Sequence, residues 1–229
     1  MMAQLVRVAR IQLVNVFSVL VLPMLIVALV LVGNIVLSGA FASGGFATGG
    51  LFALYATMLV AHLQTMTQMF PFALGLSVTR KEFFGATTMV VSGQAAIYGV
   101  LLTMGKLVEE ATGGWGVELT FLALPFLSHD NVFLQFLAYT APLVALSFLG
   151  VWIGIVFKRW GQYGVWALGV SLGAVVVGLA LIVNWQDWWD ELGRFLSSQP
   201  AIALQAGYPM VITLLLAGVS YLTMRRAVP

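Results

Sequence analysis

The chain has 229 residues, of which 61% are hydrophobic and 8% are charged, and it contains no cysteine. Soluble domains carry a charge on about a quarter of their residues, so this composition excludes an ordinary water-soluble fold. The lack of cysteine excludes disulfides, thiolate metal sites and cysteine nucleophiles. A net charge of +2, spread over scattered basic pairs, gives no reason to expect nucleic acid as a partner.

Six apolar segments without acidic or basic residues follow one another along the chain. Each is long enough to cross a hydrocarbon core of roughly 30 Å as a helix. Their continuous apolarity also differs from the alternating pattern of a membrane β-strand. We therefore expect an all-α fold, with residues 1–229 forming a single transmembrane domain of six spans. The expected spans cover 13–33, 51–73, 84–105, 132–157, 164–184 and 201–224.

The first apolar segment must be distinguished from a secretory signal peptide. Arg7 and Arg10 precede it, and Ala40-Phe41-Ala42 resembles a signal-peptidase site. A signal-peptide core has roughly 7 to 15 apolar residues, and the run over residues 13–33 is longer. We therefore expect this segment to be retained as the first membrane span.

The second segment is the most polar of the six. It contains Tyr55, His62, Gln64, Thr65 and Gln68. In hydrocarbon such groups seek hydrogen bonds with neighbouring helices, each worth around 0.6 to 2 kcal/mol. These residues therefore either hold helices together or line a substrate path or a subunit interface, and the sequence leaves both interpretations open.

Enzyme chemistry finds little support in the sequence. His62 falls in a span and His129 in an outer loop, so we expect no metal site. No charged residue lies well inside a span, although membrane carboxylates are typical of proton relays and ion pathways. Glu109 and Glu110 fall in a loop, where we expect them to be solvated. The chain also has no G-x-x-x-x-G-K-[ST] phosphate loop, so we expect neither an ATP site of that kind nor an enzyme activity of its own.

The turn after the second span carries a helix-start signal. Thr79 followed by Glu82 fits a capping box, in which the two residues satisfy each other's backbone amides. A helix should then start at Thr79 and place Arg80 and Lys81 on a rigid, exposed turn. That turn either contacts another protein or only begins the third span with membrane anchors.

Two small-residue patterns occur later in the chain. They are Gly150-x-x-x-Gly154 in the fourth span and Gly169-x-x-x-Gly173 in the fifth. This spacing lets helix backbones approach closely. We expect both pairs to form packing contacts between helices.

The segment between the fifth and sixth spans has apolar residues at helical spacing. Tryptophans on one face and charged residues on the other are typical of a helix in the membrane interface. We expect an interfacial outer helix that serves either as an aromatic anchor or as a lid over an outer exit. Its apolar face holds Trp185, Trp188, Trp189, Leu192, Phe195 and Leu196.

The basic residues favour one side of the membrane. Eight of the ten fall on the side of both termini, and only Lys106 and Arg194 fall opposite. By the positive-inside rule both termini are then cytoplasmic. We expect a multi-pass protein of a bacterial plasma membrane. The eight residues are Arg7, Arg10, Arg80, Lys81, Lys158, Arg159, Arg225 and Arg226.

The turn after the second span also matches a family pattern. Its matching residues are Leu74, Gly75, Ser77, Thr79, Arg80, Lys81, Glu82 and Phe83. Residues 70–85 thereby resemble the cytoplasmic turn of ABC-2 type permeases, the membrane subunits of ATP-binding-cassette exporters. The family run there is Leu-Gly-x-[Ser/Thr]-Arg-[Arg/Lys]-x-[Phe/Tyr], and this chain has one residue more than its shortest form. Six spans, cytoplasmic termini and an outer helix extend the resemblance, but this chain lacks the large outer domain of larger relatives.

The resemblance implies a transport function. Residues 77–85 would be the coupling element, with Gly75 contributing, and would dock on a separate cytoplasmic ATP-binding subunit that holds ATP and Mg²⁺. This chain would hold no cofactor and no metal. Two such subunits would serve two permease chains in the lipid membrane, as a homodimer in preference to a heterodimer. The stretch with Arg7 and Arg10 would lie along the inner membrane surface, and the complex would move an amphipathic or apolar compound outward.

Other functions stay open at this point. The chain could be a membrane scaffold or assembly subunit without a transport role, or an intramembrane enzyme centred on His62. Co-purification with an ATPase separates a permease from a scaffold. The sequence leaves the cargo open among a drug, a peptide, a lipid and an ion.

Overall fold

The computed structural model describes residues 2–13, 17–41 and 46–225. A short part of the first predicted span, together with Ala42 and Arg226, lies outside these ranges. Within them the chain is built almost wholly from helices, and its two strands have two residues each and pair in parallel. The predicted all-α class is therefore confirmed.

Short π-helical turns lie between several of the helices. The α-helices are α1 (Met2–Gln12), α2 (Leu22–Phe41), α3 (Leu51–Gln64), α4 (Phe70–Gly75), α5 (Arg80–Ala111), α6 (Val132–Trp185), α7 (Trp189–Ser198) and α8 (Tyr208–Arg225). The π-helical turns are η1 (Phe17–Val21), η2 (Thr65–Met69) and η4 (Ala203–Gly207). The segment labelled η3 (Gly114–Glu118) is an irregular turn, because the backbone angles of Trp115, Gly116 and Val117 are not helical. The strands are β1 (Phe46–Ala47) and β2 (Leu119–Thr120).

Several of these helices have the length and composition of membrane spans. Within the described ranges, 4 helices are long and apolar enough to cross a bilayer. This confirms the make-up of a transmembrane protein. The four are Val19–Ala40, Arg80–Ala111, Val132–Trp185 and Ala203–Arg225.

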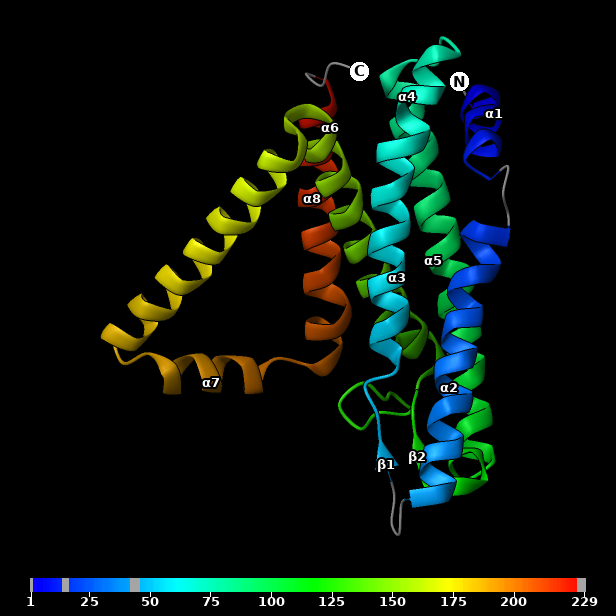
Figure 1. Cartoon of the computed structure of the whole chain (residues 1–229). Coiled ribbons are helices and arrows are strands. Elements are labelled where there is room, and N and C mark those ends of the chain that lie inside the picture. Colours follow the sequence, from blue (N-terminus) through cyan, green and yellow to red (C-terminus); the bar gives the residue numbers. More distant parts are fainter. Residues whose placement is uncertain (1, 14–16, 42–45, 226–229) are drawn as a thin grey trace.

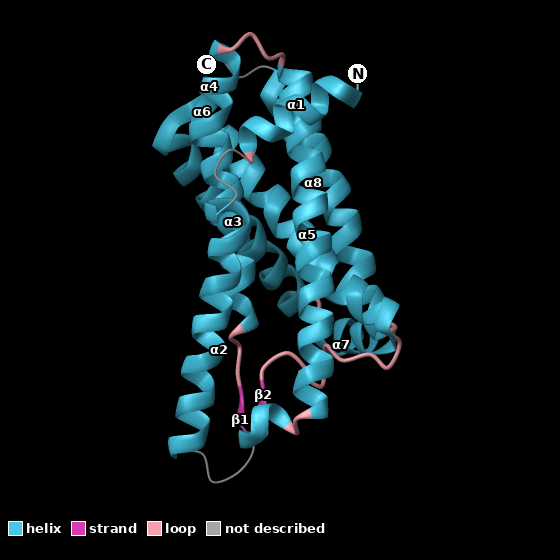
Figure 2. Cartoon of the chain, turned by 90° about the vertical axis from the view of Figure 1, so that its right-hand side faces the viewer, coloured by secondary structure: helices cyan, strands magenta, loops and turns pink. Residues whose placement is uncertain are grey.

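The long helices run along a common direction and form a bundle (Figures 1 and 2). The first part of α6 lies at its centre, where α6 packs against α3, α5 and α8. The start of α1, the end of α8 and α4 lie at one end of the bundle, and the strand pair and α7 lie at the other (Figure 1). The two ends therefore carry different parts of the chain.

The first apolar helix extends further along the chain than the sequence predicts. It covers Leu22–Phe41, whereas the predicted span covers 13–33. Two polar side chains are accommodated near its end because each finds a carbonyl partner. Asn34 donates to the carbonyl one turn earlier at 2.8 Å, and Ser38 donates to the Val117 carbonyl at 3.0 Å.

The second predicted span is one continuous helical rod formed by α3, η2 and α4. The residues at both junctions keep right-handed helical backbone angles. The wider π-helical turn ends two residues before Pro71, whose ring would press against the carbonyl four residues earlier in a regular α-helix. The rod therefore passes a proline without ending.

α6 changes direction at Gly161, whose φ of 67° and ψ of −161° lie in a region open almost only to glycine. The part before the break, 132–160, packs in the bundle. The part after it, 162–185, slopes away, and α7 runs across to α8 (Figure 1). Side chains on this second part are exposed, including Trp166 at 66% and Val170 at 69%. A long apolar surface is thus uncovered in the described single chain.

The two glycine pairs of α6 behave differently. A Cβ atom at Gly150 would overlap the backbone carbonyl oxygen of Leu59, and one at Gly154 would lie 2.6 Å from a side-chain carbon of the facing rod. Close packing at this pair is confirmed. A Cβ at Gly169 or Gly173 would meet nothing within 4 Å, so the packing expected there is not formed within one chain.

α7 is the helix expected between the last two predicted spans. It is shorter than the predicted helical segment, because Asp187 adopts a φ of 56° and separates it from α6. Its side chains are exposed on both the polar and the apolar face, with Trp189 at 51% and Phe195 at 53%. In a single chain, nothing described covers its aromatic surface.

Candidate functional site

The turn between α4 and α5 begins with a well-formed helix ending. The Val78 amide donates to the Ala73 carbonyl at 3.2 Å, and the Ser77 amide donates to the Leu74 carbonyl at 3.0 Å. These two bonds are the Schellman pattern. Ser77 has the left-handed φ of 61° that the motif requires, a position that glycine usually occupies. The path of the chain out of α4 is therefore fixed by backbone hydrogen bonds.

The predicted capping box at the start of α5 is confirmed. The Glu82 amide donates to Thr79 Oγ1 at 3.2 Å, and the Thr79 amide donates to Glu82 Oε2 at 3.0 Å. The Thr79 hydroxyl also donates to Glu82 Oε2, at 2.8 Å. The turn is capped on both sides.

The residues predicted to couple to a partner differ in how they face. Arg80 Nη1 donates to the backbone oxygen of Arg225 at 2.8 Å and so ties α5 to the end of α8. Phe83 is fully buried, with its ring centroid 5.3 Å from that of Phe70. Phe83 therefore supports the turn from inside and does not face outward. Gly75, Ser77, Thr79 and Lys81 are exposed, and Arg80 and Glu82 are partly exposed.

α1 packs beside this turn with apolar residues on its inner face and arginines on its outer face. Val8 and Ala9 are buried, while Arg7 and Arg10 are exposed. A groove of about 700 Å³ opens between α1, the start of α5 and the end of α8. Its mostly apolar lining includes Leu5, Lys81, Phe84, Gly218 and Tyr221.

Four of the five polar residues singled out in the second span line one cavity of about 250 Å³. They are His62, Gln64, Thr65 and Gln68. Tyr55 does not line it, because its hydroxyl is enclosed within the described core. The cavity is completed by Gln12, Val19, Ala61, Met69, Val90 and Gln94, which come from α1, η1, the rod and α5.

Gln12 and Gln94 are site residues that sequence reasoning missed. Their side chains are 4% and 3% exposed. Each is an amide in an otherwise apolar stretch, which is a weak signal, and only the fold brings both next to His62. No charged side chain in the described part of the chain lines the cavity, and no three histidine or acidic residues gather there to hold a metal. The cavity is therefore polar and uncharged.

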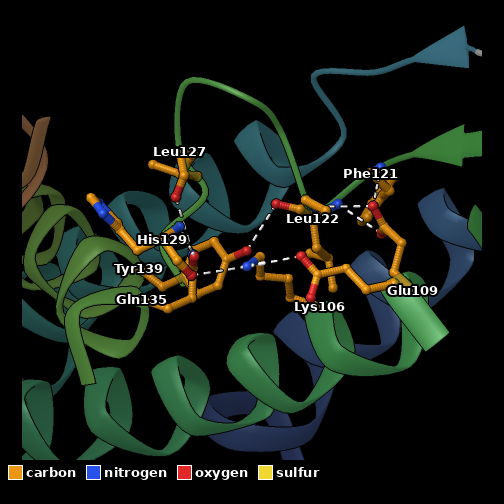
Figure 3. Close-up of polar contacts among 10 residues, drawn as sticks. Lys106, Glu109, Phe121, Leu122, Leu127, His129, Gln135 and Tyr139 are labelled. Atoms are coloured by element: carbon orange, nitrogen blue, oxygen red, sulfur yellow. Dashed lines mark hydrogen bonds and ion pairs between the residues drawn. The ribbon is translucent and has the colours of Figure 1, made fainter. Parts of the chain in front are cut away.

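A buried polar network closes the opposite end of the bundle (Figure 3). Glu109 is 2% exposed, so the prediction that it is solvated is wrong. Its carboxylate accepts hydrogen bonds from the backbone amides of Phe121, Leu122 and Ala123 and from the indole of Trp115, at 2.8 to 3.0 Å. The segment after α5 thus folds around one carboxylate.

Lys106 extends this network toward the start of α6 (Figure 3). Its side chain is nearly buried, and Nζ lies 2.9 Å from the carboxylate of half-exposed Glu110 and donates to the His129 carbonyl at 3.1 Å. Gln135 accepts from the His129 amide at 2.8 Å and donates to the Leu127 carbonyl at 3.2 Å. Because these groups satisfy one another, we interpret the network as a structural clasp on the loop.

The chain matches no known protein-family model, and no curated protein or solved structure shows significant similarity to it. The case for its function therefore rests on its own residues and their arrangement.

Proposed function

We propose that the chain is the permease subunit of an ATP-binding-cassette exporter. Two copies would work with two cytoplasmic ATP-binding subunits and move an amphipathic or apolar compound outward. The observation that carries the proposal is the turn between α4 and α5, which is exposed, basic and capped on both sides. The bond from Arg80 to the end of α8 ties it to a second helix. Such a turn can pass the movement of a partner to several helices at once, whereas a mobile loop would absorb it.

We further propose six membrane crossings with both termini in the cytoplasm. The crossings are α2, the α3–α4 rod, α5, the two parts of α6, and η4 with α8. The reversal at Gly161 supports this count, since it divides α6 into two parts that can each span a core of roughly 30 Å. Lys158 and Arg159 precede that reversal, at the end of the bundle where α1 starts and α8 ends. Basic residues gathered on one side favour the cytoplasm for that side.

α7 fits the outer interface in this arrangement. It runs across the direction of the bundle, toward the end away from both termini (Figure 1). Exposed tryptophans and a charged opposite face are the features of helices that lie at headgroup depth. In that position α7 would anchor the outward-sloping part of α6.

The orientation can be tested by cysteine labelling, because the natural chain has no cysteine. We expect Ser197→Cys in α7 to react with a membrane-impermeant maleimide added to intact cells. Ser77→Cys should react only after the membrane is permeabilised. Both side chains are exposed in the structure, so access and not burial decides the result. Labelling of Ser77→Cys in intact cells would contradict the proposed function.

The coupling role can be tested by charge reversal in the complex with its ATPase. We expect Lys81→Glu to lower substrate-stimulated ATP hydrolysis and transport about tenfold or more. A partner surface that receives a basic turn would repel the introduced carboxylate, and like charges across an interface cost several kcal/mol. Lys158→Glu makes the same charge change at the same end of the bundle and should act within about twofold. Equal losses in the two variants, with unchanged amounts of folded protein, would show that the turn has no special role.

A further inference from the structure

Two buried amides in the cavity between α1, the rod and α5 have acceptor oxygens without a partner. Gln12 Oε1 and Gln94 Oε1 are enclosed, and no group in the described chain donates to either. Buried polar atoms nearly always have a hydrogen-bond partner, because leaving one unpaired is costly. The two oxygens therefore require a donor that the described residues do not supply.

The orientation of the Gln94 amide is fixed by its neighbours. Nε2 donates to the Val19 carbonyl at 2.6 Å and to the Tyr98 hydroxyl oxygen at 3.0 Å. A carbonyl can only accept, so the opposite orientation of the amide would place two acceptors in contact. Tyr98 gives its own proton to the Leu20 carbonyl at 2.9 Å. Oε1 is therefore the atom of Gln94 that is left without a donor.

Gln12 faces a hydroxyl instead of a carbonyl. Its Nε2 donates to Thr87 Oγ1 at 2.8 Å while the Thr87 hydroxyl donates to the Phe83 carbonyl at 3.0 Å, which leaves Oε1 of Gln12 without a donor. A hydroxyl can donate as well as accept, so a turned Gln12 amide would still pair with Thr87 and would present its NH₂ group instead. Gln94 is therefore the amide whose free acceptor is fixed.

His62 and Thr65 add two more acceptors. His62 Nδ1 lies 2.9 Å from the Met58 carbonyl, so Nδ1 carries the proton and Nε2 presents a lone pair. The Thr65 hydroxyl donates to the Ala61 carbonyl at 3.0 Å, which leaves its oxygen as an acceptor. The buried and half-buried part of the lining thus offers acceptors from the Gln94 amide, one imidazole and one hydroxyl. The exposed amides of Gln64 and Gln68 also line the cavity and can donate or accept. Part of the lining, including Thr65, lies on the π-helical turn η2, and such turns are frequent at functional sites.

We propose that this cavity binds the primary ammonium group of an amphipathic small molecule, with His62, Thr65 and Gln94 accepting its hydrogen bonds. An ammonium has three donors and no acceptor, which fits a lining that is rich in acceptors. Bonds from a charged donor are also stronger than neutral ones. A hydroxyl supplies a single donor, and a carboxylate supplies only acceptors, so both fit less well. The apolar residues Val19, Met69 and Val90 in the same lining suit a hydrocarbon tail.

The inference that this ligand is cargo rests on the proposed exporter function, but binding itself needs no ATPase. The test uses the purified full chain in nanodiscs of zwitterionic phosphatidylcholine. Hexylammonium, hexan-1-ol and hexanoate are compared in the same potassium chloride buffer. We expect hexylammonium to raise the melting temperature by about 5–10 °C at about 100 times its dissociation constant. Hexanol should raise it less, and hexanoate should not raise it.

A matched pair of variants locates the binding. Thr65→Val and Thr57→Val each remove a hydroxyl that is bonded to the carbonyl four residues earlier in the rod, and only Thr65 lines the cavity. We expect Thr65→Val to weaken hexylammonium binding about 3- to 10-fold and Thr57→Val to leave it unchanged. His62→Leu should weaken hexylammonium binding about tenfold or more, because it removes the imidazole acceptor. The fold should be kept, because the Met58 carbonyl keeps its place in the helix.

Three results would overturn the proposal. An equal rise with hexanoate would show that the tail alone binds. An equal rise on adding potassium or sodium chloride alone would assign the site to an inorganic cation. No rise with any probe in the wild-type chain would mean that the cavity holds water only. None of these results bears on coupling at Lys81, so the two proposals fail separately.

Discussion

Glu109→Gln is expected to lower the free energy of unfolding by about 3–5 kcal/mol. The carboxylate accepts four hydrogen bonds, two on each oxygen, from Trp115, Phe121, Leu122 and Ala123. Glutamine has one carbonyl oxygen, and its NH₂ group would face two of these donors. Two buried N–H groups would then lose their partner, at about 1–3 kcal/mol each.

Glu118→Gln provides the control for this effect. Glu118 lies in the same connecting segment and loses the same charge, but its side chain is exposed. We expect a change within about 0.5 kcal/mol. Reversible unfolding of both variants in detergent, followed by helix content, measures the difference. If both substitutions lowered the free energy of unfolding equally, the Glu109 carboxylate would not be the anchor of this segment.

Features that depend on neighbouring residues could be predicted from the sequence. The capping box of Thr79 and Glu82 joins residues three apart, so the start of α5 is encoded locally. The break after Arg159 and the amphipathic pattern of α7 are local in the same way. The all-α class followed from composition and segment length. The local sequence sets these features, so they can be predicted without knowledge of the tertiary contacts.

Features that depend on contacts between distant residues could not be predicted. Glu109 bonds to amides 12 to 14 residues later, so its sequence neighbourhood looks like a solvated acidic pair. Gln12 and Gln94 come together with His62 only when α1 packs on α5 beside the rod. Phe83 matched a family position for partner contact, yet the fold places it in the core. The extension of α2 to Phe41 likewise brings Ser38 to the Val117 carbonyl, in a segment far along the chain.

Gly150→Leu is expected to cost about 3 kcal/mol or more of folding stability, whereas Gly169→Leu should change it by no more than about 0.5 kcal/mol. Both glycines begin a small-xxx-small pattern in α6. A side chain at 150 would meet the backbone of Leu59, which cannot move aside without separating α6 from the rod. A side chain at 169 would meet open space.

The matched variants therefore separate a packing glycine from one that only repeats the pattern. Thermal unfolding of each variant in the same detergent gives the comparison, and the spacing of α6 from the rod can be followed with a spin-label pair. A large loss for Gly169→Leu in the monomeric chain would mean that the second part of α6 packs against the bundle. A loss for Gly169→Leu seen only in the proposed permease complex would instead place that part of α6 against a second subunit, because its apolar face is uncovered in the single chain.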